Sequence, residues 1–415
     1  MSGSQAPACS PDTMRRLDPA LLIVLGGVSA ALHVGKLPPA LPVLQQALGV
    51  SLLQAGFLLS LVQLAGMTLG LAVGLAADSL GLKRTMVAGL VIVSTASLLG
   101  GWAVDPGSLM ALRAAEGLGF LLASMPAPGL ILRLVSPERM SRTLGLWGAY
   151  MPFGTALALV GGPLVIAAVG WPGWWWLLAA ISGAMALWLA LALPPDAASP
   201  GAASERQGWS DRLRLALSSR GPWLVALCFA VYAAQWLAVI GFLPSVYVEA
   251  GLAPSLAGAA TALAAAANIS GNVVSGRLLQ RGAQPHHLLY VGFAAMGLGG
   301  FLAFAPVWEG MDKTLAASLR YAAVLMFSSV GGLIPGTLFS LAVRVAPGQR
   351  TVSATMGWAQ QWSAAGQLAG PPLVAWVATL AGGWHWSWLV TGGCALAGLG
   401  LAALVGALLR RSPAT

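Results

Sequence analysis

The chain has 415 residues, of which 58% are hydrophobic and only 8% are charged, and its formal net charge is +9. A soluble globular protein carries about 25% charged residues, so this composition excludes a soluble domain and predicts an integral membrane protein whose main solvent is lipid. The cations occur in short clusters between apolar segments along the whole chain, which argues against nucleic acid as a partner, because that needs a basic patch on one domain.

Twelve apolar segments are long enough to cross a bilayer as helices, which takes about 20 residues each. The first segment comes directly after Arg15 and Arg16, an arrangement that is also found in signal peptides. However, it is longer than the apolar core of a signal peptide, and we expect it to be retained as a membrane helix. The predicted helices span residues 19–42, 52–77, 84–104, 107–131, 142–168, 174–193, 222–247, 255–278, 286–307, 315–341, 352–379 and 386–409.

The longest polar interruption divides these segments into two halves of six helices. Within it, Trp209, Leu213 and Leu215 alternate with charged residues and predict a short helix on the membrane surface. The expected organisation is an N-terminal tail (1–18), a six-helix bundle (19–193), a linker (194–221), a second six-helix bundle (222–409) and a C-terminal tail (410–415).

The distribution of Lys and Arg predicts the orientation, because cations favour the cytoplasmic side of a membrane. With both termini inside, every cation lies on a cytoplasmic segment except Lys36, Arg113, Lys313 and Arg320. We therefore expect a multi-pass protein of the inner (plasma) membrane with cytoplasmic termini. The halves also repeat at an offset of 202 residues, which aligns Pro42 with Pro244, Gly49 with Gly251, Gly56 with Gly258 and Gly74 with Gly276.

The link between the second and third predicted helices reads GLAADSLGLKR and contains Gly74, Asp78, Gly81, Lys83 and Arg84. Its spacing, G-x-x-x-D-x-x-G-x-[KR]-[KR], resembles the loop between helices 2 and 3 of major facilitator superfamily transporters. The resemblance implies a gate motif in which Asp78 helps to close the cytoplasmic side, with Arg84 as its partner. The alternative is an ordinary charged turn that obeys the positive-inside rule.

This resemblance covers nearly the whole chain and implies an all-α membrane protein with 12 transmembrane helices in two pseudo-symmetric six-helix bundles. Such bundles rock about a substrate site near the bilayer midplane and open it to each side in turn. The segment from Lys36 to Pro42, Trp147-Gly148 and Gln235-Trp236 are together similar to the cyanate and nitroimidazole-resistance branch of the family.

Ionisable residues inside membrane helices are costly and mark candidate functional sites. Arg113 and Glu116 stand at i, i+3 on one helix face and resemble the family's R-x-x-[QE]-G element. We expect them to pair, either as a structural ion pair or as a proton-coupling site. His33 and Lys36 could converge with Arg113, or else His33 is a hydrogen-bonded packing residue and Lys36 snorkels to the outer surface.

Polar residues of the second half complete the predicted site. Arg320 occupies roughly the place of Arg113, with an outer-surface cation as the alternative. Gln235, Asn268 and Gln361 could hydrogen-bond a substrate or make ordinary interhelical contacts. Counted together, Lys36, Arg113, Arg320 and His33 outnumber the one intramembrane acid, Glu116, and this surplus favours an anionic substrate.

The predicted function is that of a secondary active transporter, with proton-coupled uptake of a small organic or inorganic anion as the favoured form. The alternatives are an efflux carrier for neutral or amphipathic compounds, favoured by the Trp and Met content, and a membrane sensor without transport. We expect a functional monomer whose partners are substrate, protons and lipid. No enzyme activity, cofactor or metal is expected, because the three cysteines lack ligand spacing and no phosphate-binding G-x-x-x-x-G-K-[ST] loop is present.

Overall fold

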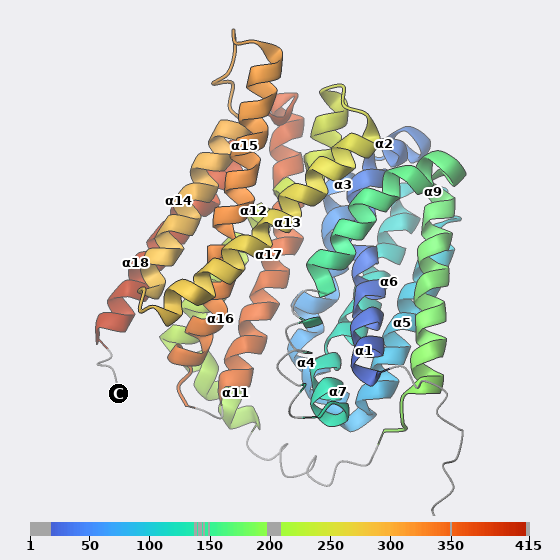
Figure 1. Cartoon of the computed structure of the whole chain (residues 1–415), viewed down its shortest axis with the longest axis vertical. Helices are drawn as coiled ribbons and strands as arrows, with labels where there is room; N and C mark the ends of the chain where they lie inside the picture. Colours follow the sequence, from blue (N-terminus) through green and yellow to red (C-terminus); the bar gives the residue numbers. More distant parts are fainter. Residues whose placement is uncertain are drawn as a thin grey trace, which may run out of the picture.

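The structure is a computed structural model that describes residues 18–136, 139, 143, 146–147, 150–196, 209–348 and 351–411 (Figure 1). Within this part of the chain, the side chains of residues 74–80, 209–213, 353 and 411 are not described. All regular structure in the described residues is helical. The predicted all-α fold class is therefore confirmed.

The described helices of the first half are α1 (Pro19–Gly35), α2 (Leu37–Leu48), α3 (Leu52–Ser60), η1 (Leu61–Gln63), α4 (Leu64–Leu80), α5 (Leu82–Gly100), α6 (Pro106–Ser124), α7 (Ala127–Leu134) and α9 (Tyr150–Ala192). Those of the second half are α11 (Trp209–Ser218), α12 (Arg220–Glu249), α13 (Pro254–Gln280), α14 (Pro285–Phe304), α15 (Lys313–Gly331), α16 (Leu333–Val345), α17 (Val352–Ala381), η3 (Trp384–Trp386) and α18 (Trp388–Arg411).

Ten described stretches are long and apolar enough to cross a membrane. One of them, α9, contains two spans, because Gly170 has a φ of 75° and breaks the helix where the chain turns back. The 30-residue helix α17 covers the remaining predicted span, residues 352–379. All twelve predicted spans thus correspond to described helices, and the chain is a multi-pass membrane protein.

Several spans consist of two helices that meet at a break near proline. Proline has no N–H and clashes with the preceding turn, so a helix interior that contains it bends or is interrupted. The helices are interrupted at Lys36 before Pro38, at Pro126 between α6 and α7, and at Gly332 before Pro335. These breaks leave backbone carbonyl groups that other parts of the bundle can use as hydrogen-bond acceptors.

The two halves form two helix bundles that stand side by side (Figure 1). The bundles contact each other where α3 and α4 pack on α17, α2 packs on α12, and α9 packs on α13. We call the end of the molecule that carries Gly81 the Gly81 side and the opposite end the Asp105 side. Towards the Asp105 side the packing is close: Gly56 lies against Pro371 and Pro372.

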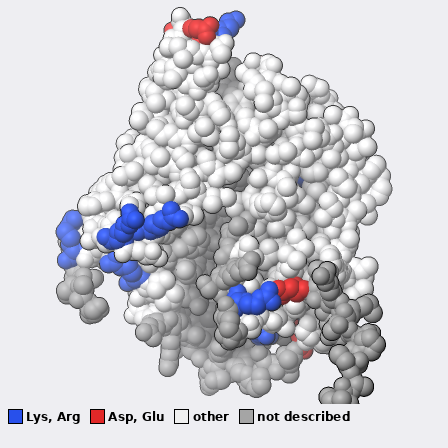
Figure 2. Space-filling view, in the orientation of Figure 1, with Lys and Arg blue, Asp and Glu red and all other residues white. Residues whose placement is uncertain are grey.

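Small residues bring the helices together, as is usual where the surrounding lipid gives no hydrophobic drive for association. Gly89 of α5 lies against the backbone of α6, and Gly366 and Gly370 of α17 lie against the carbonyl groups of Ala230 and Ala234 of α12. On the face drawn in Figure 2, charged side chains gather towards the two ends, and the broad middle band is almost free of them. A lipid-facing surface requires this distribution.

Candidate functional site

The break between α1 and α2 is the structural origin of the site. Pro38 and Pro39 cannot donate hydrogen bonds to the carbonyl groups of Val34 and Gly35, so the helix is interrupted at Lys36. The Lys36 side chain is fully buried inside the first bundle, and its carbonyl group accepts a hydrogen bond from Trp174 Nε1 at 3.2 Å. Lys36 therefore does not snorkel to a membrane surface, which corrects the alternative considered from the sequence.

Arg113 reaches across from α6 and binds backbone carbonyl groups of two interrupted spans. Its Nε donates to the Leu58 carbonyl group at 3.1 Å, close to the 3₁₀ turn that separates α3 from α4. Its Nη1 donates to the His33 carbonyl group at 2.5 Å, and its Nη2 lies 3.5 Å from that of Val34. The guanidinium group is thus held by neutral acceptors as well as by a charged one.

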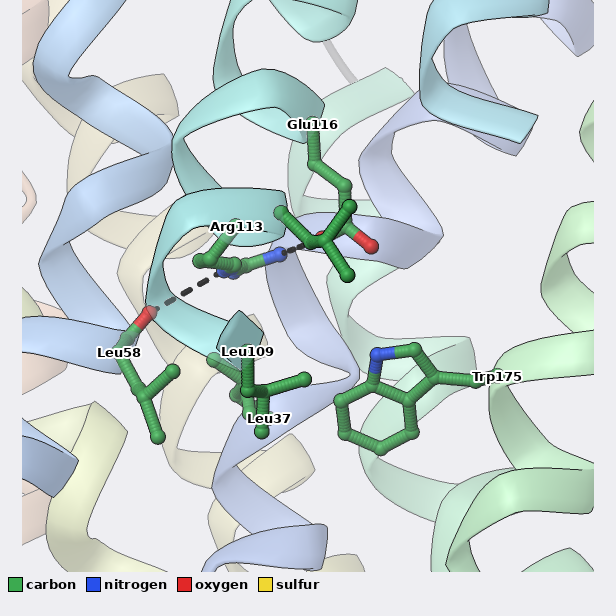
Figure 3. Close-up of a pocket in the computed structure, with 7 residues that line it drawn as sticks. Leu37, Leu58, Leu109, Arg113, Glu116 and Trp175 are labelled. Atoms are coloured by element: carbon green, nitrogen blue, oxygen red, sulfur yellow. Dashed lines mark hydrogen bonds and ion pairs between the residues drawn. The ribbon is translucent and has the colours of Figure 1, made fainter. Parts of the chain in front are cut away.

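Glu116 lies between the two cations. Its carboxylate accepts a hydrogen bond from Arg113 Nη1 at 2.8 Å (Figure 3). It also forms an ion pair with Lys36 Nζ. The side chains of all three residues are at most 2% exposed. The predicted pairing of Arg113 with Glu116 is present, and Lys36 joins it to form what we call the triad: Lys36, Arg113 and Glu116.

The surroundings of the Lys36 amino group are closed. Its Nζ donates to Ser97 Oγ at 3.0 Å and lies 4.5 Å from the centre of the Trp175 ring. Ser97 Oγ in turn donates to the Trp175 carbonyl group at 3.0 Å. The cavity beside the triad is lined mainly by leucine side chains and has no room for a water molecule (Figure 3). The side chains of the triad therefore lie in closely packed surroundings.

The His33 ring makes its hydrogen bond to a residue outside the triad. Its Nε2 is 2.7 Å from Ser182 Oγ on α9, and the residue is fully buried. Of the two possibilities that the sequence left for His33, the structure shows the hydrogen-bonded packing contact. The backbone carbonyl group of His33 accepts a hydrogen bond from Arg113.

In the second bundle, Asn268 is occupied by interhelical hydrogen bonds. Its Oδ1 accepts from Tyr232 at 3.2 Å and from Asn272 at 3.0 Å, and its Nδ2 donates to the Ser328 carbonyl group at 2.9 Å. These bonds connect α12, α13 and α15. They correspond to the ordinary interhelical contact that the sequence allowed.

Arg320 is not part of a common site with the triad. It is exposed on α15, and no described contact joins it to Lys36, Arg113 or Glu116. Its position corresponds to the outer-surface cation considered from the sequence. Its place in the sequence matches that of Arg113, but the position of a residue along a helix does not determine which way its side chain points.

Amide side chains lie where the bundles meet. Gln63 Nε2 donates to Gln367 Oε1 at 2.9 Å, and Gln361 Nε2 donates to the Met67 carbonyl group at 2.6 Å. Gln361 Oε1 is buried without a hydrogen-bond partner in the described structure, and so are both amide atoms of Gln235. Buried polar atoms are nearly always paired, so such exceptions mark places where a ligand could bind.

Beside these amides lies a group of tryptophans from α12 and α17. The rings of Trp223, Trp358 and Trp362 pack edge to face, with centroids 5.0–5.9 Å apart. Trp358 Nε1 and Thr355 Oγ1 are buried without partners among the described residues. We call Thr355, Trp358 and Gln361 the α17 polar face, because they follow each other at a spacing of three residues and are uncharged.

The described part of the gate motif is fixed by Asp196, which follows the end of α9. Gly81 has a φ of 95°, a conformation that favours glycine, and a Cβ atom there would collide with Asp196. Asp196 accepts hydrogen bonds from the backbone N–H groups of Lys83 at 2.9 Å and Arg84 at 3.0 Å. A carboxylate at the start of α5 complements the helix dipole. Gly74 and Asp78 lie among the residues whose side chains are not described.

The side chain of Lys83 continues this arrangement at the end of α9. Its Nζ donates to the carbonyl groups of Ala190 at 2.8 Å and Leu193 at 2.5 Å. Sequence reasoning missed Asp196, although an acid directly after Pro194-Pro195 at the end of a predicted span was a usable signal. The latch between Asp78 and Arg84 stays a prediction.

Two bundles of six spans with interrupted helices and a buried ionic site define a membrane transporter architecture. The model of the Major Facilitator Superfamily matches residues 23–364, and the chain belongs to that family. It is accordingly a membrane transporter and not an enzyme.

Two relatives match over part of the chain. A puromycin resistance protein of Streptomyces alboniger is 33% identical over 153 residues, which are 36% of this chain and 29% of the relative. A major facilitator superfamily multidrug transporter of Aspergillus fumigatus is 27% identical over 159 residues, 37% of this chain and 30% of the relative. The matches thus span less than a third of these relatives' length.

Solved structures share the fold over nearly the whole chain. A bacterial homologue of the human lysosomal transporter Spinster, in an inward-facing and occupied conformation, is 14% identical with a TM-score of 0.75, over 95% of this chain and 98% of that one. A D-xylose-proton symporter is 16% identical with a TM-score of 0.71, over 93% and 96%.

Proposed function

We propose that this transporter is a proton-coupled exporter of neutral or amphipathic compounds. The observation that carries the choice of substrate is the location of the charges. Lys36 and Arg113 are buried inside the first bundle and bound to Glu116, whereas the α17 polar face, next to the contact between the bundles, is uncharged. A substrate held between the bundles there would meet aromatic rings and amides.

The α17 polar face fits an amphipathic ligand with an aromatic part. Small-molecule sites are mostly apolar and aromatic, with a few polar groups that fix orientation. Trp358 and Trp362 offer ring surfaces, Trp358 Nε1 offers a donor and Gln361 Oε1 an acceptor. The names of the two relatives, a puromycin resistance protein and a multidrug transporter, support an exporter of this kind.

Anion uptake is the second candidate, and one observation favours it. If all its members are ionised, the triad carries one more positive than negative charge. However, Lys36 and Arg113 are enclosed, and Arg320 is exposed on α15. The cation surplus counted from the sequence would therefore have to act on a substrate from behind closely packed side chains.

We further propose that the protein acts as a monomer in the inner membrane with the Gly81 side in the cytoplasm. Residues 19–193 and 222–409 would be the rocking units, joined by the linker 194–221. The orientation is supported by the clustering of cations towards one end and by the positive-inside rule (Figure 2). Close packing on the Asp105 side fits a form that is closed towards the outside.

The test is transport in proteoliposomes with an imposed pH gradient. We expect labelled puromycin to accumulate in the acidic lumen beyond its level in protein-free liposomes, and Arg113→Ala to abolish the excess. Lys313→Met is the matched control, because Lys313 lies at the exposed start of α15. Labelled cyanate tests the anion candidate in the same vesicles. If cyanate moves and puromycin does not, the proposed substrate class is wrong, and if the gradient drives neither, proton-coupled export is wrong.

A further inference from the structure

We propose that Lys36 is the residue that releases and regains the transported proton, while Glu116 remains a carboxylate throughout the cycle. This assignment rests on the proposed proton coupling and differs from the expectation drawn from the sequence, in which Glu116 carries the proton. It follows from the charges and contacts of the triad.

The net charge of the triad distinguishes Lys36 from Glu116 as the residue that carries the transported proton. Arg113 keeps its charge under all ordinary conditions, since a guanidinium group is not deprotonated in proteins. With Lys36 and Glu116 both ionised, the triad has a net charge of plus one in a site that is at most 2% exposed. Protonation of Glu116 would raise that charge to plus two, whereas loss of a proton from Lys36 would bring it to zero. Burial of unpaired charge is costly, so the second change is the favourable one.

The groups around Lys36 allow this change. From α6 it faces Glu116 and, beyond it, Arg113; from α5 it meets Ser97, and from α9 the Trp175 ring. His33, one turn earlier on α1, directs its ring to Ser182 instead. When Lys36 is neutral, Arg113 still neutralises Glu116 through the bond at 2.8 Å, so no charge is left without its partner.

The step itself is a simple proton transfer. One N–H bond of the Lys36 ammonium group breaks, the electron pair stays on Nζ, and water on the open side of the transporter takes the proton. The neutral amine regains a proton from the opposite side after the bundles have rocked. Because one amine is involved, a single proton moves per cycle. The position of Lys36 at the break between α1 and α2 provides a point where such opening could admit water.

The deciding variant is Lys36→Met, because it leaves the neutral pair of Arg113 and Glu116 in place. Purified protein in weakly buffered detergent solution is mixed with puromycin, and a pH indicator reports the protons released on binding. We expect a single proton from the wild type and from the control Lys313→Met, and none from Lys36→Met. In proteoliposomes, Lys36→Met should lose accumulation driven by a pH gradient but keep exchange of puromycin for puromycin.

The outcomes separate this assignment from the proposed function. A wild type that neither binds puromycin nor releases a proton refutes proton-coupled export itself. Proton release that persists in Lys36→Met refutes only the assignment to Lys36, because the proton then comes from another group. If Lys36→Met does not bind puromycin, Lys36→Arg is tested in its place, because the arginine side chain keeps its charge. The Lys36→Arg variant should bind puromycin without releasing a proton. Release from Lys36→Arg, or loss of binding in both variants, also overturns the assignment.

Discussion

Replacing Glu116 by glutamine should destabilise the first bundle more than any other single change in the triad. Glu116→Gln keeps the size of the side chain and an oxygen acceptor but removes the carboxylate that binds both Lys36 and Arg113. The two cations then face each other across a neutral amide in a site that is at most 2% exposed. The cost comes from desolvated charge that has lost its partner.

Breaking a buried ion pair by removing one partner costs about 3–5 kcal/mol, because the other charge remains uncompensated. Here the carboxylate has two partners, so we expect the upper part of that range. An unfolding entropy of about 2 cal/mol/K per residue converts this range into a fall in Tm of roughly 3–6 °C if the 415 residues unfold together. Part of the cost disappears if Lys36 becomes neutral, so the difference from wild type should shrink as the pH is raised.

The assay is thermal unfolding of detergent-purified variants at fixed detergent and scan rate. Lys36→Met is the matched comparison, since it removes a cation and leaves a neutral pair, together with the loss of one cation–π contact to Trp175. We expect Glu116→Gln to lower Tm clearly more than Lys36→Met does. If the two variants have the same Tm, or if Lys36→Met is the less stable one, the charge balance described for the triad is wrong.

Three further changes test the packing and the helix ends by the same measurement. Gly366→Leu should prevent normal association of α17 with α12 and cost at least about 1–3 kcal/mol, whereas Gly393→Ala, which faces open space, should have little effect. Gly81→Ala should cost about 1–3 kcal/mol, because a φ of 95° strains any residue with a Cβ atom. The Ser108 N–H group donates to the Asp105 carboxylate and holds the pKa of that carboxyl below its usual range. The stabilisation of α6 by Asp105 is therefore present above the ordinary aspartate pKa of about 4 and is lost as the pH falls through the lower pKa of the folded state. Asp105→Asn should remove this acid sensitivity.

The membrane spans could be predicted from the sequence because lipid imposes a length and an apolar composition on every crossing. The same physics explains why the Arg113–Glu116 pair was predictable: two residues at i, i+3 on one helix share a face, and burial forces opposite charges together. Both inferences use only local spacing, which the sequence contains.

The remaining contacts of the site depend on how distant segments meet. Lys36 reaches Glu116, 80 residues away, because α1 and α6 pack beside each other in the first bundle. Asp196 reaches the start of α5 over more than 110 residues. Burial decided the partners of the cations counted from the sequence: Lys36 and Arg113 are buried with Glu116, whereas Arg320 is exposed.

The position of the triad connects its charge to the contact between the bundles. Glu116 is followed by Gly117, which lets α6 pack directly on the backbone of Val62 in the 3₁₀ turn η1. The next residue of that turn, Gln63, hydrogen-bonds Gln367 of the other bundle at 2.9 Å. A change in charge that moves α6 must therefore press on η1, because Gly117 leaves no space there, and η1 carries the hydrogen bond that holds α17. The proposed proton transfer would therefore take place beside a tight contact that leads directly to a hydrogen bond between the bundles.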